Sequence, residues 1–175
     1  MRLPVLVLNS QADRRLKLGH LWIYSNEVDT AKSPLKSFSM GQQALVTTNS
    51  GKPLGVAVIN PNGLICGRLV SRDEKYPLNK SLLVHRIKQS LALRELAFDE
   101  PFYRLIYGDA DLLPGLVVDR FGELVDLFLK LHADLSERFG IYGDALHFHA
   151  HQNRQQRSFD LVEDFFLTGF GQQAA

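Results

Sequence analysis

Few side chains in this sequence could act as a nucleophile, and the first to consider is its single cysteine. Cys66 lies between Ile65 and Gly67 in a strand-like apolar run, where a free thiol is more often a small core residue than a reactive group. One cysteine can form neither an internal disulfide nor a zinc cluster, which agrees with a reducing compartment. We therefore predict no catalytic thiol in this chain.

Histidines at alternate positions are the second candidate for chemistry. On a strand, His147, His149 and His151 would all lie on one face. Zinc needs three or four converging ligands, whereas side chains along a single strand splay apart, so we predict no metal site. The glycine pairs at 140–143 and 169–171 do not lie between a strand and a following helix, and we predict no cofactor site there.

Carboxylates gather in the run from residue 103 to residue 122, which predicts two short strands around a structured turn. The strands are expected at residues 105–106 and 116–118. Gly108 and Gly115 can take positive φ, and Pro114 fixes the backbone just before Gly115. We interpret the three aspartates of this run as turn-shaping residues without chemistry of their own: Asp109, Asp111 and Asp119.

Short strands dominate the first part of the chain. We expect strands at residues 3–8, 22–24, 44–48, 54–59 and 64–70, and one or two helical turns at 11–18. Turn residues separate the last three strands at 49–53 and 60–63. Several short strands joined by tight turns predict a small barrel, with the polar segment 72–77 leading out of it.

A long helix is expected between residues 78 and 98. Its apolar face is formed by Leu83, Val84, Ile87, Leu91 and Phe98. We interpret Lys80 and Arg94, which flank this face, as snorkelling or solvated charges.

The predicted fold class is α+β, a small β pseudo-barrel followed by a long helix and a β-hairpin. A helix at 131–139 and a strand at 146–150 would complete a small α+β unit. We predict domains at 1–75 for the barrel and 76–130 for the helix and hairpin, with an acidic tail at 131–175.

Charge is distributed unevenly along the chain. Residues 1–94 hold 14 Lys or Arg against 5 Asp or Glu, a net charge of +9, whereas residues 95–175 hold 6 against 14, a net charge of −8. A polyanion-binding domain joined to a different domain would have this pattern. A solvated basic surface without a specific partner agrees with the charge equally well.

No apolar run approaches the ~20 residues that span a bilayer, and the N-terminus does not have the pattern of a signal peptide. We therefore expect a soluble, cytoplasmic protein without membrane contacts.

Three ordered motifs resemble one enzyme family. They are Arg14-Arg15 followed by the run at 19–28, the run at 60–68, and the run at 103–122. Together they are similar to the bacterial S-adenosylmethionine-dependent methyltransferases that make 5-methylcytosine in large-subunit ribosomal RNA. The resemblance covers about residues 3–124. Leu21, Tyr107 and Leu112 depart from the family pattern, which has Pro, His and Gly at these positions.

The resemblance implies that the barrel is a PUA domain that binds structured RNA, here large-subunit ribosomal RNA, through phosphate contacts and shape. Candidate phosphate contacts are Arg14, Arg15, Lys17, Arg68, Arg72 and Lys75. His20 and Trp22 are candidates for stacking on a base or hydrogen bonding to it. A lone tryptophan in a small domain is more often part of the core, and each basic residue could equally be a solvated surface charge.

The catalytic machinery of the resembled family is not expected in this chain. A Rossmann-like sheet with a glycine-rich turn for S-adenosylmethionine and a nucleophilic cysteine would have to follow residue 124, and the sequence ends at Ala175 without a second cysteine. We expect the RNA-recognition part of a truncated methyltransferase, inactive alone. One alternative is a protein-interaction or dimerisation module. Another is a hydrolase using His and Asp, which no spacing here requires.

Overall fold

The computed structural model describes residues 3–122, 124–129 and 146–151, with side chains described up to Gly122. The chain divides into two compact units, Met1–Leu78 and Asn79–Ala175. Within the described residues, no helix has the length and apolar character needed to cross a membrane.

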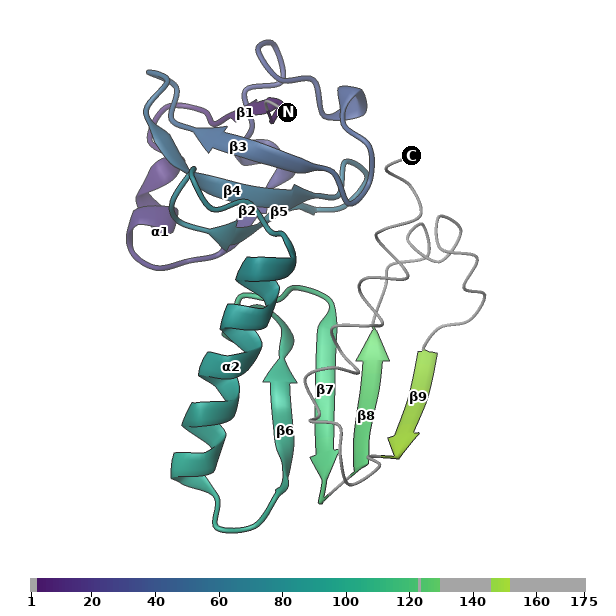
Figure 1. Ribbon diagram of the computed structural model, residues 1–175. Helices are drawn as coiled ribbons and strands as arrows, with labels where there is room; N and C mark the ends of the chain where they lie inside the picture. The colour runs from purple at the N-terminus through teal and green to yellow at the C-terminus, as the bar shows by residue number, and fades with distance from the viewer. Residues whose placement is uncertain (1–2, 123, 130–145, 152–175) are drawn as a thin grey trace. The chain divides into compact units, whose positions relative to one another are not determined.

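The first unit is built on a five-stranded sheet in the order β1-β3-β4-β5-β2 (Figure 1). Its strands are β1 (Val5–Val7), β2 (Trp22–Tyr24), β3 (Gln43–Thr47), β4 (Pro53–Ile59) and β5 (Ile65–Ser71). Neighbouring strands are antiparallel except β1 and β3, which are parallel. The short α1 (Asp13–Lys17) and two 3-10 turns, η1 (Ser25–Glu27) and η2 (Leu35–Ser37), complete the unit.

The sheet curls because the outer edge of β1 bonds to the chain just after β2. Leu8 and Val28 form an isolated antiparallel bridge. Asn9 N donates to Glu27 O at 2.8 Å, and Asp29 N donates to Val7 O at 2.9 Å. These bonds cover an edge that would otherwise be open for pairing with another chain. The result is a small half-barrel, which is the form that the predicted β pseudo-barrel takes in this structure.

Apolar side chains fill the concave side of this half-barrel. The fully buried members of the core include Leu6, Leu8, Ile23, Val46, Ile59, Cys66 and Leu69. Gly55 lies where β4 passes closest to the end of β5, with φ of +138°, and a Cβ there would overlap the Ser71 carbonyl oxygen. Only glycine fits this crossing without a shift of the backbone.

The second unit consists of α2 and a four-stranded antiparallel sheet in the order β6-β7-β8-β9 (Figure 1). Its elements are α2 (Lys80–Ala97), β6 (Phe102–Tyr107), the 3-10 turn η3 (Gly108–Asp111), β7 (Leu116–Phe121), β8 (Leu124–Leu129) and β9 (Leu146–His151). The helix begins after Asn79, whose side-chain oxygen accepts from Leu82 N at 2.9 Å. An Asn N-cap of this kind stabilises a helix start by about 1 kcal/mol.

This architecture confirms the predicted α+β class. The helix expected at 78–98 is α2, and the strand expected at 146–150 is β9. The helix expected at 131–139 lies outside the described residues. The predicted hairpin is β6 and β7, although β7 continues through Asp119 to Phe121 instead of ending at residue 118.

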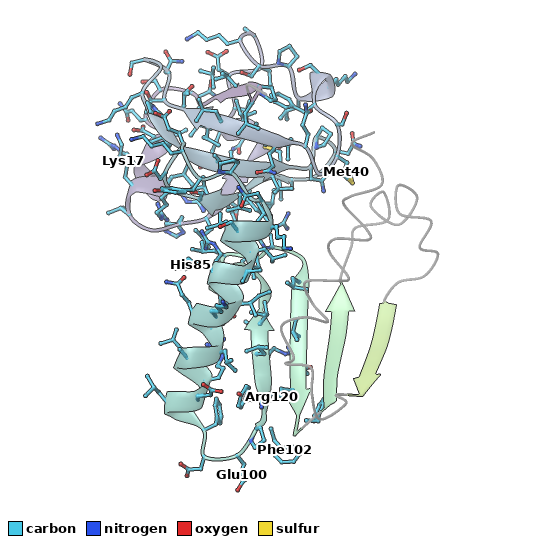
Figure 2. The ribbon with its side chains drawn as sticks, viewed as in Figure 1. Lys17, Met40, His85, Glu100, Phe102 and Arg120 are labelled. Atoms are coloured by element: carbon cyan, nitrogen blue, oxygen red, sulfur yellow. The ribbon has the colours of Figure 1, made fainter. Side chains whose placement is uncertain are left out.

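The predicted apolar face of α2 is buried at Leu83 and Ile87 but not at its C-terminal end. Leu83 and Ile87 are buried, but Phe98 keeps 48% of its surface exposed. Phe98 follows the helix and stacks on Tyr103, with ring centroids 5.4 Å apart. Figure 2 shows Arg120 on the side of the sheet toward α2, where it donates to the Tyr103 hydroxyl at 2.9 Å.

Arg94 on α2 and Asp111 in the turn between β6 and β7 hold these two parts of the second unit together. Both residues differ from their predicted roles. Arg94 Nη2 lies 2.9 Å and 3.1 Å from the two Asp111 carboxylate oxygens, and its Nε donates to Arg104 O at 3.1 Å. The same carboxylate accepts from Ser90 Oγ at 3.0 Å and from Tyr107 N at 2.6 Å. Arg94 is therefore not a solvated charge, and Asp111 does more than shape a turn.

Asp119 also differs from its predicted role. It lies within β7, directly opposite Arg104 on β6, and pairs with that guanidinium at 2.7 Å and 2.9 Å. This bidentate hydrogen bonding raises the pKa of Arg104 above its ordinary value. Asp119 is a cross-strand partner and not a turn residue.

Leu112 has a left-handed backbone, with φ of 59°. The strand-turn-strand motif of the resembled family has glycine here, so this turn keeps the glycine conformation with a leucine in it. A non-glycine residue in this region costs roughly 1–2 kcal/mol, which the rest of the turn must offset. Gly108 and Gly115, as predicted, also take positive φ, at 55° and 83°.

We predict that Asp111→Ala destabilises the second unit by about 2–4 kcal/mol, because it leaves the largely buried Arg94 charge without its partner. Urea unfolding followed by circular dichroism at 222 nm, which reports chiefly on α2, measures the change. Asp119→Ala is the matched control, because its ion pair is more exposed and should cost less than about 1 kcal/mol. Equal losses for the two variants would contradict this interpretation of Asp111.

Candidate nucleic-acid interface

The candidate RNA-contacting residues lie on two segments that meet in the first unit. Arg14, Arg15 and Lys17 are on α1, and the chain continues through His20 to Trp22 on β2. The remaining three candidates are Arg68 on β5 and Arg72 and Lys75 in the segment that follows it.

Arg72 joins these two segments. Its Nη1 donates to Leu16 O at 2.7 Å, and its Nη2 donates to His20 O at 3.1 Å. The last carbonyl groups of a helix have no partner within the helix, so this guanidinium satisfies the end of α1 and holds the loop behind it. Arg72 therefore has a structural task that the sequence did not indicate.

Arg15 lies over the ring of Tyr24. Its guanidinium carbon lies 4.8 Å from the centre of the Tyr24 ring, and its Nη1 lies 3.2 Å from Glu27 Oε1. The other Glu27 oxygen accepts from Tyr24 N at 2.9 Å. The carboxylate thus fixes both the strand end and the guanidinium above it, and the Arg15 side chain remains 40% exposed.

Trp22 is not a core residue, although a lone tryptophan is usually found there. Ile23 points into the core and is fully buried, while Trp22 on the opposite face of β2 keeps 40% of its surface exposed. Arg68 is its direct cross-strand partner on β5. Residues directly opposite in antiparallel strands project from the same face, so Trp22 and Arg68 lie side by side on the convex face of the sheet.

The other candidates are exposed. Lys17 forms an ion pair with Asp13 one turn earlier, and the hydrogen bond from Lys17 lowers the pKa of Asp13. Figure 2 places Lys17 at the outer side of α1, across the unit from Met40. Arg14, His20 and Lys75 have exposed side chains on the same two segments.

The first unit as a whole is basic. Residues 1–78 contain 10 Lys or Arg against 5 Asp or Glu. Three of these acidic residues, Asp13, Glu27 and Asp29, already form ion pairs with basic neighbours. The unit therefore has an excess of positive charge, which attracts polyanions at long range.

Tyr24 and Glu27 belong to this surface and were not among the predicted residues. The signal for Tyr24 is its position two residues after Trp22 on a strand, which puts both aromatic side chains on one face. The signal for Glu27 is its position three residues after Tyr24, the spacing of a capping box.

Cys66 is fully buried in the core, and this burial raises the pKa of its thiol to about 11. Within the ranges that the structure describes, no three His, Cys, Asp or Glu side chains gather as a metal site would require. His147, His149 and His151 lie on β9, beyond the residues whose side chains are described.

The described residues do not form the strand, glycine-rich turn and helix with which a Rossmann-like domain binds S-adenosylmethionine. The sheet of the second unit is antiparallel throughout, and α2 follows the loop segment before Asn79, not a strand and glycine-rich turn. No methyl-transfer step is therefore assigned to these residues.

Comparison with known proteins agrees with the geometry. Residues 6–72 match the family of PUA-like domains. Two solved structures have the same fold over most of this chain. One, described as a SAM-dependent methyltransferase from Streptococcus mutans, has a TM-score of 0.64 at 19% identity and matches 89% of this chain and 45% of its own. The other, described as a methyltransferase complexed with SAH, has a TM-score of 0.60 at 19% identity, over 90% of this chain and 44% of its own.

Curated relatives share one description. Ribosomal RNA large subunit methyltransferase I of Salmonella gallinarum is 30% identical over 129 residues, which is 72% of this chain and 31% of that protein. The corresponding protein of Photobacterium profundum is 32% identical over 112 residues, 62% of this chain and 28% of its own length. This chain therefore contains a PUA-like domain and is homologous to the N-terminal portion of ribosomal RNA large subunit methyltransferase I. It spans less than a third of the length of these relatives.

We predict that Cys66 is unreactive in the folded protein. With its pKa raised to about 11, the thiolate population at pH 8 falls roughly 100-fold below that of an ordinary cysteine, and burial also blocks access. Labelling with iodoacetamide, followed by mass spectrometry, should modify the chain only after denaturant is added. Rapid labelling of the native protein at pH 8 would contradict the assignment of Cys66 to the core.

Proposed function

We propose that this chain binds structured RNA, specifically large-subunit ribosomal RNA, as the RNA-recognition part of an S-adenosylmethionine-dependent rRNA (cytosine-C5) methyltransferase. The observation that carries the proposal is a PUA-like domain in which exposed basic and aromatic side chains gather on α1, β2 and the end of β5. The homology to the N-terminal portion of rRNA methyltransferases supports the same partner.

Phosphate contact is the proposed source of most of the affinity. Arg14, Lys17 and Lys75 extend from the surface and carry charges that can approach the RNA backbone. Arg68 lies directly opposite Trp22 on β5, and His20 lies two residues before Trp22. Arg15 already donates a hydrogen bond to Glu27, and Arg72 donates one to the Leu16 carbonyl oxygen. Their contribution to RNA binding therefore includes fixing the shape of the surface.

The methyl donor and the catalytic cysteine belong, in this proposal, to the part of the full-length relatives that this chain does not match. The chain recognises RNA in the cytoplasm and is inactive alone.

A protein-interaction or dimerisation module is the second candidate, and one observation favours it. Leu93 and Leu96 lie three residues apart on α2 and keep 58% and 86% of their surfaces exposed. Exposed apolar residues at this spacing are common at helix–helix contacts. Native mass spectrometry at micromolar concentration would show a dimer if these residues bind a second copy.

We predict that binding to large-subunit rRNA fragments weakens steeply with salt. The logarithm of the affinity should fall linearly with the logarithm of salt concentration, because each phosphate contact releases counterions. Arg14→Ala combined with Lys75→Ala should reduce the slope by roughly 2. Lys36→Ala combined with Lys52→Ala removes the same charge from exposed positions outside the two segments and should change the slope less.

Calorimetry with S-adenosylmethionine on the same sample separates recognition from catalysis. The proposal predicts no heat of cofactor binding by this chain. Binding of the cofactor would reveal a methyl-donor site and overturn the view that the chain only recognises RNA. Absence of RNA binding at low salt would overturn the proposed function itself.

A further inference from the structure

Two aromatic side chains on the convex face of β2 each lie next to an arginine. Tyr24 lies beneath the Arg15 guanidinium, and Trp22 lies directly opposite Arg68 on β5. Aromatic rings and guanidinium planes are the surfaces on which proteins stack unpaired nucleobases.

The Arg15 guanidinium is positioned as a plane and not as a mobile charge. Glu27 holds one edge at 3.2 Å, and the Tyr24 ring supports one face at 4.8 Å. The Arg15 side chain keeps 40% of its surface exposed, so part of it is accessible to a ligand. A guanidinium held in this way provides a flat, rigid surface, which a lysine cannot provide.

Trp22 on β2 keeps 40% of its surface exposed, and β2 lies at the end of its sheet. β2 is the last strand of its sheet in the order β1-β3-β4-β5-β2, so only one of its sides is paired with a strand. The exposed His20 lies just before β2. Arg72 holds the backbone there by donating a hydrogen bond to the His20 carbonyl oxygen. A nucleotide chain can thus pass along the strand without displacing a neighbouring strand.

The spacing of the two stacking positions selects unpaired RNA. Trp22 and Tyr24, the ring that lies under the Arg15 guanidinium, are two residues apart on one face of β2 and are separated by roughly 6.6 Å along the strand. Successive bases on one strand of a duplex are stacked about 3.4 Å apart. Two successive bases can occupy both positions only if they are unstacked from each other and extended, as in a loop or a bulge.

We propose that the convex face of β2 binds two successive unpaired nucleotides of RNA, one base stacking on Trp22 and the next on the Arg15 guanidinium above Tyr24. This inference rests on the proposed RNA-binding function and specifies the element of the RNA that is bound. Phosphate contacts by α1 position the RNA, and the two stacking positions require it to be single-stranded at β2.

The chain contains one tryptophan, so its fluorescence reports on the proposed site directly. The probes are a 12-nucleotide RNA without self-complementarity and the duplex that it forms with its complement, titrated at the same salt concentration. The single strand should quench Trp22 fluorescence on binding, and the duplex should leave the signal unchanged. Equal quenching by both, or no quenching by a single strand that binds, would overturn the proposal.

Substitution of Arg15 distinguishes stacking from phosphate contact. Arg15→Lys keeps the charge but removes the plane, and it should weaken single-strand binding by about 10-fold, as much as Arg15→Ala does. Full binding by Arg15→Lys would identify Arg15 as a phosphate contact and overturn the stacking assignment. Circular dichroism of both variants verifies that each is folded, and the wild-type titrations test the proposal without any substitution.

Substitution of Trp22 provides the second test, measured by anisotropy of labelled RNA. Trp22→Phe should retain most of the affinity, whereas Trp22→Ala should lose about 10-fold with the salt dependence unchanged. Unchanged affinity in Trp22→Ala would remove Trp22 from the site. If the wild-type chain binds neither probe nor rRNA fragments, the proposed function fails; if it binds with a steep salt dependence while Trp22 is silent, only the stacking proposal fails.

Discussion

The candidate interface depends on the pair of hydrogen bonds from Arg72 to the carbonyl oxygens of Leu16 and His20. These bonds connect residues 56 and 52 positions apart in the sequence. A helix as short as α1, with five residues, has no stability of its own in water. Hydrogen bonds from a charged donor contribute about 1–2 kcal/mol each when partly exposed, enough to hold α1 and the following loop to the segment that leaves β5. The positions of Arg14, Lys17 and His20 follow from this attachment.

Arginine performs a similar task in both units. In the second unit, Arg94 binds the Asp111 carboxylate with one nitrogen and the Arg104 carbonyl with another, which ties α2 to β6 and to the turn after it. In the first unit, Arg15 donates to Glu27 and its guanidinium lies over the Tyr24 ring. A planar group with five donors can satisfy two partners at once, which lysine cannot do. Part of the basic excess therefore serves the fold, and the remainder is available at the surface.

The sequence predicted the elements better than the partners of their side chains. Alternating apolar runs and Asn, Pro and Gly turns were sufficient for β3, β4 and β5, and apolar periodicity was sufficient for α2. The roles of Arg72, Arg94 and Asp119 were not predictable, because each depends on which distant segment lies opposite in the folded chain. The exposure of Trp22 depends on the order of strands in the sheet, since an aromatic residue on a terminal strand can face outward. The stacking position at Arg15 required both the strand alternation and the contact with Glu27.

The most direct test of the central claim is a residue-by-residue map of the RNA contact. Amide chemical shifts of the isotope-labelled chain, recorded during titration with a large-subunit rRNA fragment that has an unpaired loop, provide this map. The account predicts that the largest changes occur at residues 14–24 and 66–75, which contain α1, β2 and the end of β5. Changes concentrated instead in the turn at 48–53 or in α2 would contradict it, because the RNA would then bind elsewhere on the chain.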